Sequence, residues 1–533
     1  MNMSKLKELE EMLSKGRISR REFLIRSSAL GLTAALSPAL LGTPAHAQKP
    51  KKGGRLRQGL GECSTTDSLD PAVIPAAMPR NIDWQVRNNL VEIDYKGNAI
   101  PELAESWEAT PDAAKWTFKL RKGVEFHNGK SLEAEDVIFS VDHHRKEDSK
   151  SAIKGIVEQI KEMKADGKQT VIFTLEGGNA DFPFILADYH LPIVPTGTAG
   201  AEWEKGIGTG GYILVSFEPG VRALTRRNPN YWKEGCAHFD EVETIGIADV
   251  TARTNALMTG QIDCMNQCDL KTVHLLKAKP DIQVIQVTAA RHYTTAMLCD
   301  IPPYNNNDVR LGLKHAIDRE QILKAILRGY GSLGNDQPIG PSYRFHATPS
   351  ELPQRKYDPD KAKFYLRKAG MEGHVFKLHA ADAAFAGAVD TAVLYSEQAA
   401  KAGIKIEVVR EPDDGYWSNV WIKKEWCMVY WNGRATEDGM FSISYAADSN
   451  WNDTHWKNER FNKLLKTARA ELNDAKRREM YVEMQCIASD DSGNIIPMFA
   501  DIVDAASTKL KFGPIGAQFE LDSSRNTERW WFA

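Results

Sequence analysis

The sequence predicts an α/β protein of two or three domains, and three observations lead to this prediction. The chain has 533 residues, which is too many for one hydrophobic core. Segments of its first half alternate apolar and polar residues, as half-buried strands do. Its second half repeatedly carries helix-start and helix-stop residues. A hydrophobic content of 42% and a charged content of 26% are ordinary for a globular protein.

Residues 1–47 are predicted to be a twin-arginine export signal. SRREFL at 19–24 is followed by a weakly apolar run at 27–42 and by the small-residue cleavage site Ala-His-Ala at 45–47. The alternative is a short membrane anchor, but the run is shorter than about 18 residues and contains Pro38, so it would span a bilayer poorly. We therefore expect cleavage after residue 47 and a location in the periplasm.

Charge and cysteine content narrow the class of partner. The formal net charge is only −3 and no basic stripe is present, so we expect no nucleic-acid partner. No other segment is long and apolar enough to span a membrane. The seven cysteines are an odd number, so at least one is unpaired and the protein is not a scaffold built on disulfides. We expect a monomer.

The first half of the mature chain is predicted to contain mainly strands. A strand at 56–60 runs into a polar loop at 61–67, and residues 116–120 alternate with the period of a half-buried strand. Asp166-Gly167 and Pro219-Gly220 each lie between two such segments, and both pairs favour tight turns. The sequence therefore predicts a hairpin at each of these two turns.

The second half is predicted to be richer in helix. Asp318 with Gln321 three residues later is typical of a capped helix start, and Asp358-Pro359 opens a second helix. Two further helices are predicted over 461–472 and 477–487 from the apolar residues on one face.

The most informative stretch is a short apolar strand that ends at a charged turn. Residues 426–431 contain two tryptophans, and Asn432-Gly433 ends the strand. Arg434, Glu437 and Asp438 follow within a few residues. Aromatic walls that exclude water, together with a few fixed charges, are what a small-solute pocket requires. The alternative is a solvated surface loop after a core strand.

Patterns for catalysis, nucleotides or metals are weak. Residues 329–334 match G-x-G-x-x-G, but a helix precedes them instead of a strand, so we expect a flexible loop. Cys264 and Cys268 lack a second Cys/His pair for zinc, and His143 and His144 lie on different faces of a helix. We predict no cofactor and no metal, and an enzyme is the less favoured hypothesis.

One segment very closely resembles a known family. Residues 101–144, PELAESWEATPDAAKWTFKLRKGVEFHNGKSLEAEDVIFSVDHH, resemble the signature segment of the family 5 extracellular solute-binding proteins, the peptide, nickel and opine group of ATP-binding-cassette (ABC) importers. The likeness continues, in the family's order, through residues 208–212, 227–232, 308–319 and 357–359.

This resemblance implies a two-lobed periplasmic binding protein fold (type II, cluster C-like) with an extra domain. By analogy, lobe I combines residues 48–86, 209–288 and 500–533, extra domain II spans 87–208, and lobe III spans 289–499. The crossings near 287–291 and 498–502 would be hinges, and the lobes would close on the ligand. The implied partners are a small-molecule or peptide ligand and the ABC permease and ATPase subunits in the inner membrane.

The resemblance also indicates where the ligand would lie. Members that hold peptides often place an aspartate after W-x-G to pair with the peptide ammonium, whereas here Trp431-Asn432-Gly433 is followed by Arg434. A guanidinium binds carboxylates and repels an ammonium. We therefore expect a peptide-like, acid-bearing solute such as an opine, with Glu437 and Asp438 available to an amine or hydroxyls.

Three alternatives to this interpretation stay open. Arg434 could pair with Glu437 or Asp438 inside its own loop. The protein could be an ordinary di- or oligopeptide carrier, or a secreted enzyme that reuses the fold.

Further ligand-site residues follow from the same likeness. The first-lobe loop would contribute Cys63, Ser64, Thr65 and Asp67, and the walls would be Trp417, Trp431 and Phe441. In relatives a cysteine of the first loop bridges to one at the position of Cys264, which predicts a Cys63–Cys264 disulfide. The alternative is that both thiols are reduced.

Overall fold

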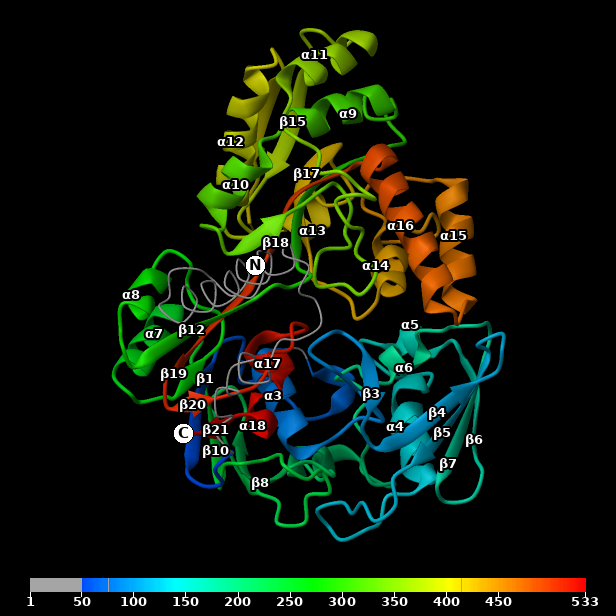
Figure 1. Ribbon diagram of the computed structural model, residues 1–533, viewed down its shortest axis with the longest axis vertical. Helices are drawn as coiled ribbons and strands as arrows, with labels where there is room; N and C mark the ends of the chain where they lie inside the picture. Colours follow the sequence, from blue (N-terminus) through cyan, green and yellow to red (C-terminus); the bar gives the residue numbers. More distant parts are fainter. Residues whose placement is uncertain (1–49, 75, 414) are drawn as a thin grey trace, which may run out of the picture. The chain divides into compact units, whose positions relative to one another are not determined.

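The computed structural model describes residues 50–533 except residues 75 and 414 (Figure 1). The predicted export signal lies outside these residues. Within them the strands form three large sheets and two small ones. No described helix is both long and apolar enough to cross a bilayer.

The first large sheet has seven strands and combines the start, middle and end of the chain. Its order is β12-β19-β11-β1-β10-β9-β8. The strand bounds are β1 Arg55–Leu60, β8 Tyr212–Glu218, β9 Arg222–Arg227, β10 Glu241–Gly246, β11 Cys264–Met265, β12 Ile282–Val287 and β19 Ile502–Ser507. β1 pairs in parallel with both β10 and β11. The predicted strand at 56–60 and the β8–β9 hairpin around Pro219-Gly220 are confirmed.

The second large sheet has four antiparallel strands in the order β4-β5-β7-β6. The bounds are β4 Ala104–Ala109, β5 Lys115–Leu120, β6 Ile160–Ala165 and β7 Thr170–Leu175. Helix α4 (Ala134–Arg145) packs against it, and Trp116, Phe118 and Phe173 belong to the core between them. The predicted strand at 116–120 and the hairpin at Asp166-Gly167 are confirmed.

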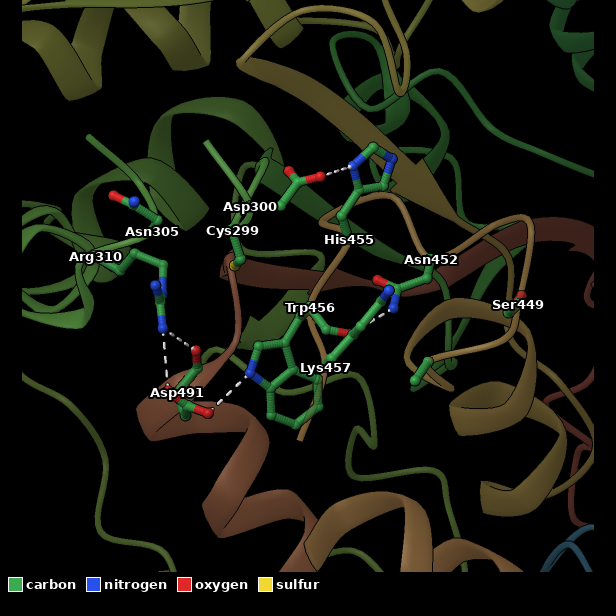
Figure 2. A pocket seen from close by; sticks show the side chains of 11 residues that line it. Cys299, Asp300, Asn305, Arg310, Ser449, Asn452, His455, Trp456, Lys457 and Asp491 are labelled. Carbon is green, nitrogen blue, oxygen red and sulfur yellow. Dashed lines mark hydrogen bonds and ion pairs between the residues drawn. The ribbon is translucent and has the colours of Figure 1, made fainter. Parts of the chain in front are cut away.

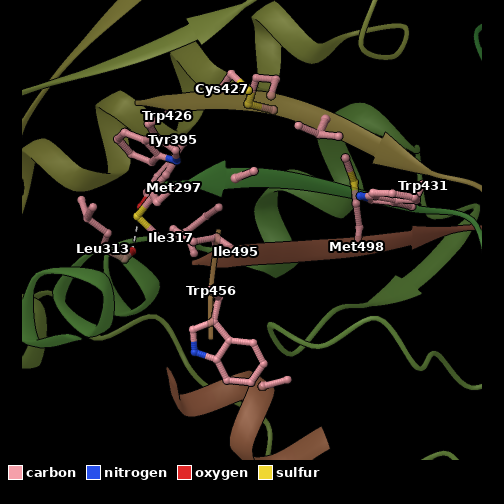
Figure 3. Close-up of a cluster of buried hydrophobic side chains, with 14 of the residues drawn as sticks. Met297, Leu313, Ile317, Tyr395, Trp426, Cys427, Trp431, Trp456, Ile495 and Met498 are labelled. Atoms are coloured by element: carbon pink, nitrogen blue, oxygen red, sulfur yellow. Dashed lines mark hydrogen bonds between the residues drawn. The ribbon is translucent and has the colours of Figure 1, made fainter. Parts of the chain in front are cut away.

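The third large sheet has six strands in the order β14-β18-β13-β17-β15-β16. The bounds are β13 His292–Met297, β14 Gly331–Leu333, β15 Val375–Ala380, β16 Lys405–Arg410, β17 Trp426–Trp431 and β18 Asn494–Ala500. Its core holds the fully buried Trp426, whose indole N–H donates to the Thr295 hydroxyl over 2.7 Å. Figure 3 shows this ring beside Met297 and Tyr395.

Helices cover the third sheet. Asp318 and Asp358 cap the two helices predicted to begin there, by accepting from the backbone N–H of Gln321 and of Lys361. The helix bounds are α9 Asn307–His315, α10 Arg319–Ile326, α11 Pro359–Lys368, α12 Ala388–Ala400, α13 Tyr416–Asn419, α14 Glu437–Ser444, α15 Glu459–Ala470 and α16 Asp474–Asp491. The last two correspond to the helices predicted over 461–472 and 477–487, and Figure 1 shows them side by side in orange.

The remaining elements are short. They are β2 Val91–Ile93, β3 Ala99–Pro101, β20 Leu510–Lys511, β21 Trp531–Phe532, α3 Ala77–Val86, α5 Lys154–Val157, α6 Phe182–Ile185, α7 Val250–Met258, α8 Val273–Lys277, α17 Glu520–Ser524, α18 Asn526–Arg529 and the 3-10 turns Pro71–Val73 and Gly200–Lys205. Within α17 the residues Leu521, Asp522 and Ser523 have positive φ, so this turn winds left-handed.

The expected flexible loop at 329–334 is wrong in part, because Gly331 begins β14 and pairs with Ala500 of β18. A side chain at Gly331 would lie 2.3 Å from the Phe499 carbonyl oxygen. Glycine therefore allows the two backbones to approach.

The chain passes twice between the seven-stranded and six-stranded sheets, and the fold is a two-lobed α/β fold with an added domain. It leaves β12 at Val287 and enters β13 at His292, and it returns from β18 at Ala500 to β19 at Ile502. We propose the limits of lobe I, domain II and lobe III given above, because each large sheet lies within one of them.

Candidate functional site

The predicted site stretch lies at one end of the lobe III sheet. In the β13–β17 ladder His292 stands opposite Trp431, and Met297 opposite Trp426. Trp431 therefore lies where the chain crosses between the sheets, and Trp426 lies at the far side. We call the region of residues 290–293 and 430–434 the hinge end, and the region of residues 297–305 and 452–457 the distal end.

Arg434 is held by the carbonyl groups of its own turn. Its Nη1 donates to the backbone oxygens of Asn432 (2.9 Å) and Gly433 (3.3 Å), and its backbone N–H donates to the Tyr343 hydroxyl (3.0 Å). Its guanidinium carbon lies 6.0 Å from the ring centroid of Trp431. No carboxylate within the described residues lies at ion-pair distance from it. The alternative that Arg434 pairs with Glu437 or Asp438 is therefore wrong.

Glu437 and Asp438 are not available to a ligand, which corrects the expectation from sequence. Both lie in the first turn of α14, whose cap Thr436 accepts from the Gly439 N–H, and acidic residues are favoured at a helix start. Glu437 accepts from the Phe345 N–H over 2.6 Å, and Asp438 pairs with Arg469 over 3.1 Å. Burial raises the pKa of Asp438 to about 6.

Phe441, predicted as a wall, is fully buried in the lobe III core. Its ring packs edge-on against Tyr445 and Phe461. The reason is the helix α14, which turns Phe441 inward one turn after Glu437.

Arg434 lies near residues of another part of the chain. Burial lowers the pKa of Arg434, and the nearby Tyr343 hydroxyl, Asp188 carboxylate and Tyr189 hydroxyl act in the opposite direction. Asp188 is itself bonded to His190 Nδ1 over 2.7 Å. Residues from the 87–208 segment and from lobe III therefore approach each other around this guanidinium.

Tyr189 belongs to an aromatic group that faces Arg434 from outside lobe III. Its ring meets Phe519 edge to face at 5.6 Å and Trp84 at 6.4 Å. The Arg80 guanidinium lies 4.1 Å from the Phe519 ring centroid and pairs with Glu520. Burial raises the pKa of Tyr189 to about 12, so its hydroxyl remains a neutral donor at physiological pH.

A cluster of four tryptophans borders the hinge end. Trp421 contacts Trp417, Trp431 and Trp451 nearly edge to face, at 5.8–6.2 Å between centroids. The indole N–H groups of Trp431 and Trp421 both donate to Asp453 Oδ2, at 3.0 and 3.4 Å.

Within this cluster, Trp417 is 39% exposed and Trp451 48% exposed, while Trp431 is buried. The structure thus brings together two predicted walls, Trp417 and Trp431. Sequence reasoning missed Trp421, Trp451 and Asp453, although the high density of tryptophan between residues 417 and 456 was a usable signal.

The first-lobe loop folds on itself. The Ser64 N–H donates to the Asp67 carboxylate over 3.0 Å, and Asp67 is buried while Ser64 and Thr65 are exposed. Gly220 packs so closely that a side chain there would lie 2.3 Å from the Ser64 carbonyl carbon. No hydrogen bond or ion pair among the described residues joins this loop to the turn at Arg434.

The predicted Cys63–Cys264 disulfide is wrong in this structure, in which all seven cysteines are free. Cys264 Sγ is buried and receives a long contact, 3.8 Å, from the side-chain amide of Asn526. Cys63 Sγ instead lies against Gly246, on the neighbouring strand. Cys264 and Cys268 are both buried.

A cavity of about 550 Å³ lies at the distal end (Figure 2). Four of its charged or titratable side chains contact one another in pairs, whereas the exposed Lys457 has no ion-pair partner among the described residues. His455 Nδ1 lies 2.9 Å from Asp300, Arg310 lies 3.1 Å from Asp491, and the Trp456 indole N–H donates to Asp491 over 2.9 Å. The cavity is thus separate from Arg434.

One buried cluster of carboxylates has the spacing of a metal site, but its negative charges are already neutralised by side chains. Glu92, Glu102 and Glu528 bring carboxylate oxygens within 4.8 Å of one another. Three cations balance them: Lys233 lies 2.8 Å from Glu528, Arg525 2.6 Å from Glu102 and Arg529 2.7 Å from Glu92. The group is a closed ion network, so it offers no free charge to a cation.

Comparison with known proteins gives consistent matches. Residues 98–453 match the family model "Bacterial extracellular solute-binding proteins, family 5 Middle". The chain is 26% identical over 515 residues to Di/tripeptide-binding protein 1 of Pseudomonas aeruginosa, covering 88% of this chain and 92% of that protein.

Two solved structures resemble the fold. AgaA in complex with agropinic acid, from Agrobacterium tumefaciens R10, is 23% identical with a TM-score of 0.72, covering 90% of this chain and 99% of that one. DppA of Helicobacter pylori in complex with the peptide STSA is 24% identical with a TM-score of 0.72, covering 90% and 98%.

Proposed function

Because the chain belongs to family 5 of the bacterial extracellular solute-binding proteins, we propose that it captures a small, peptide-like solute that carries an acid group. The protein is a solute-binding component of an ABC importer and not an enzyme, as its relatives are binding proteins. An opine, an amino-acid conjugate with a free carboxylate, has the proposed chemistry. The partners of the protein are the permease and ATPase subunits of the importer.

One observation carries the choice of an acidic ligand: Arg434 has no carboxylate partner among the described residues, although it is partly buried. Burying a cation without a carboxylate at ion-pair distance is unfavourable, and the more distant Asp188 compensates the burial of Arg434 only in part. A ligand carboxylate would supply that charge and accept two parallel N–H bonds from the guanidinium. An ammonium at the same place would be repelled.

The surroundings of Arg434 support capture between two lobes. Arg434 and Trp431 come from lobe III, whereas Tyr189 comes from the segment 87–208 and Phe519 from the C-terminal segment. A ligand that contacts both sides favours the closed form of the protein, because its binding energy differs between the open and closed states. We propose export by the twin-arginine signal to the periplasm, where the closed form meets the permease.

The test uses residues 48–533 and compares acidic conjugates with unmodified dipeptides. We expect N-(1-carboxyethyl) amino acids to raise the melting temperature, since a ligand that binds only the folded state stabilises it. Arg434→Gln should weaken their binding by about tenfold to a hundredfold in calorimetry, because a charge-assisted hydrogen bond contributes about 1.5–3 kcal/mol.

Arg367→Gln is the matched control. Arg367 is an exposed arginine of lobe III that pairs with Glu372, and its loss should leave affinity unchanged. Tight binding of ordinary dipeptides that is insensitive to Arg434→Gln would instead identify a plain peptide carrier.

A further inference from the structure

A second guanidinium lies beside Arg434 at the hinge end. Arg291 belongs to the segment that joins β12 to β13, and its backbone oxygen accepts from the Ala500 N–H over 2.8 Å, at the start of the return crossing. Its Nε donates to Asn432 Oδ1 over 2.9 Å. The side chain is exposed, and no carboxylate of the described chain lies within ion-pair distance of it.

Asn432 holds both guanidiniums in place. Its side-chain oxygen accepts from Arg291 and its backbone oxygen accepts from Arg434. A guanidinium has five N–H donors. The guanidinium of Arg291 also makes a side-chain hydrogen bond to the Tyr293 hydroxyl. The Nε and Nη2 of Arg434 have no acceptor among the described residues. Because these contacts use only some of the five donors of each guanidinium, donors are left open on either side of one asparagine.

The two cations stand over neighbouring strands. His292 pairs with Trp431 and Tyr293 with Tyr430, so Arg291 and Asn432 continue the ladder by one step. Tyr293 lies close to Arg291, and Tyr430 close to Arg434, as their electrostatic influence on one another shows. Neighbouring antiparallel strands are about 5 Å apart. Because both guanidiniums also bond to the same residue, Asn432, the acid groups that fit are separated by only a few bonds.

The floor between the cations is aromatic. Tyr293 stacks on Phe385 with centroids 4.0 Å apart and planes 3° from parallel, and Tyr430 meets Trp417 at 5.5 Å. Such a floor excludes water from the short linker of a ligand and strengthens the ion pairs at both of its ends.

We infer that the ligand carries two carboxylates, one bound by Arg434 and the other by Arg291, and that the second one acts on the crossing between the lobes. This rests on the proposed function, since it assigns a further group to the same site. Two neighbouring cations without a counter-ion repel each other, and two carboxylates remove that repulsion. Because Arg291 is part of the crossing, its engagement couples the second carboxylate to closure.

The experiment is a cycle of two ligands and four proteins. The ligands are N-(1-carboxyethyl) amino acids, tested as a panel of side chains, and the same compounds with the carboxyethyl acid converted to its amide. The proteins are wild type, Arg291→Gln, Arg434→Gln and the control Arg367→Gln, each checked for folding by its apo melting temperature. Calorimetry gives affinity, and small-angle scattering gives the closure of the lobes.

We expect Arg291→Gln to weaken diacid binding by about tenfold or more and to leave the monoamide unaffected. Arg434→Gln should weaken both ligands. The diacid should make wild type more compact, and this change should be smaller in Arg291→Gln.

The inference is overturned if Arg291→Gln weakens both ligands equally, if it changes neither, or if no diacid of the panel binds. If Arg434→Gln weakens diacid binding and Arg291→Gln does not, the binding of a second carboxylate by Arg291 is wrong and the proposed function is kept. If Arg434→Gln leaves diacid binding unchanged, the proposed function itself is wrong.

Discussion

The two ends of the lobe III sheet differ in how their charges are balanced. At the distal end, a cavity of about 550 Å³ contains the ion pair of Arg310 with Asp491 and the contact of Asp300 with His455, and only its exposed Lys457 has no ion-pair partner among the described residues. At the hinge end, the described residues provide no ion-pair partner for Arg291 or Arg434. The buried cation of the cavity, Arg310, thus has its counter-charge, whereas neither arginine of the hinge end has a carboxylate at ion-pair distance among the described residues.

From this difference we infer that free charge, rather than empty volume, marks the ligand site. A carboxylate in the distal cavity would have to displace Asp491 from Arg310, and with Lys457 it would form only an exposed pair, which contributes little. A carboxylate at the hinge end replaces water around cations that have no carboxylate at ion-pair distance among the described residues. Three measurements test this comparison.

The largest effect is expected when the paired arginine is removed. Arg310 is buried and donates to the Tyr304 oxygen (2.7 Å) and to Asp491. Arg310→Met should lower the free energy of unfolding by about 2–4 kcal/mol, chiefly because it leaves the backbone oxygens of Tyr304 and Asp491 without their donor, while the partly exposed Asp491 carboxylate loses less. Urea denaturation of the apo-protein measures this loss.

Arg434→Gln is the comparison variant. It should change the free energy of unfolding by less than about 1 kcal/mol, because no ion pair is lost. Ligand affinity should instead fall in Arg434→Gln and change little in Arg310→Met. A stable Arg310→Met protein that has lost its ligand would show that the distal cavity is the site.

An intermediate effect is expected at Asp453, which links the two ends. It accepts from Trp431 at the hinge end, and the next residue, Thr454, accepts from the Cys299 N–H at the distal end. Burial raises the pKa of Asp453 from its ordinary 3.8 to about 6. Between these values the folded state binds more protons than the unfolded state, so stability falls as pH rises from about 4 to 6.

The Asp453→Asn variant should not lose stability in this way as pH rises, because the amide oxygen of the asparagine can still accept from both indoles. The difference in unfolding free energy between variant and wild type should grow by up to about 3 kcal/mol from pH 4 to pH 7. Asp448→Asn, which changes an exposed carboxyl nearby, should give a flat difference. A flat difference for Asp453→Asn as well would mean that Asp453 is ionised at little cost.

The smallest effect is expected at Cys299, which lines the distal cavity. Burial raises the pKa of this thiol to about 11, so alkylation at pH 8 should be slow. A saturating diacid bound at the hinge end should change the rate by less than about twofold, as followed by peptide mapping of iodoacetamide adducts. Strong protection of Cys299 by the ligand would place the ligand in the cavity.

Local patterns predicted the elements around the site well. The run 426–431 forms β17, the Asn432-Gly433 pair ends it, and Asp318 and Asp358 cap helices as expected. These features depend on neighbours in the sequence, so they can be read without the fold.

The errors at Glu437, Asp438 and Phe441 arose because helix α14 was not recognised in the sequence. Thr436 followed by Glu437 and Asp438 is a helix start, and α14 explains why both acids and Phe441 are turned inward. The disulfide was carried over from relatives, and nothing in the residues themselves tested it.

The rest of the site could not be predicted because distant segments build it. Trp421, Trp451 and Asp453 meet Trp431 only after β17 is covered by α13 and by the segment around residue 453. Arg291 reaches Asn432 across 141 positions of sequence. No periodicity or spacing reports such contacts.

The buried ion network has a consequence for the order of synthesis. Glu92 and Glu102 are translated early, but two of the cations that pair with them, Arg529 and Arg525, follow 437 and 423 residues later. β19 likewise lies between β11 and β12 in the finished sheet. The ion network and the seven-stranded sheet can therefore be completed only after this distant segment has been translated.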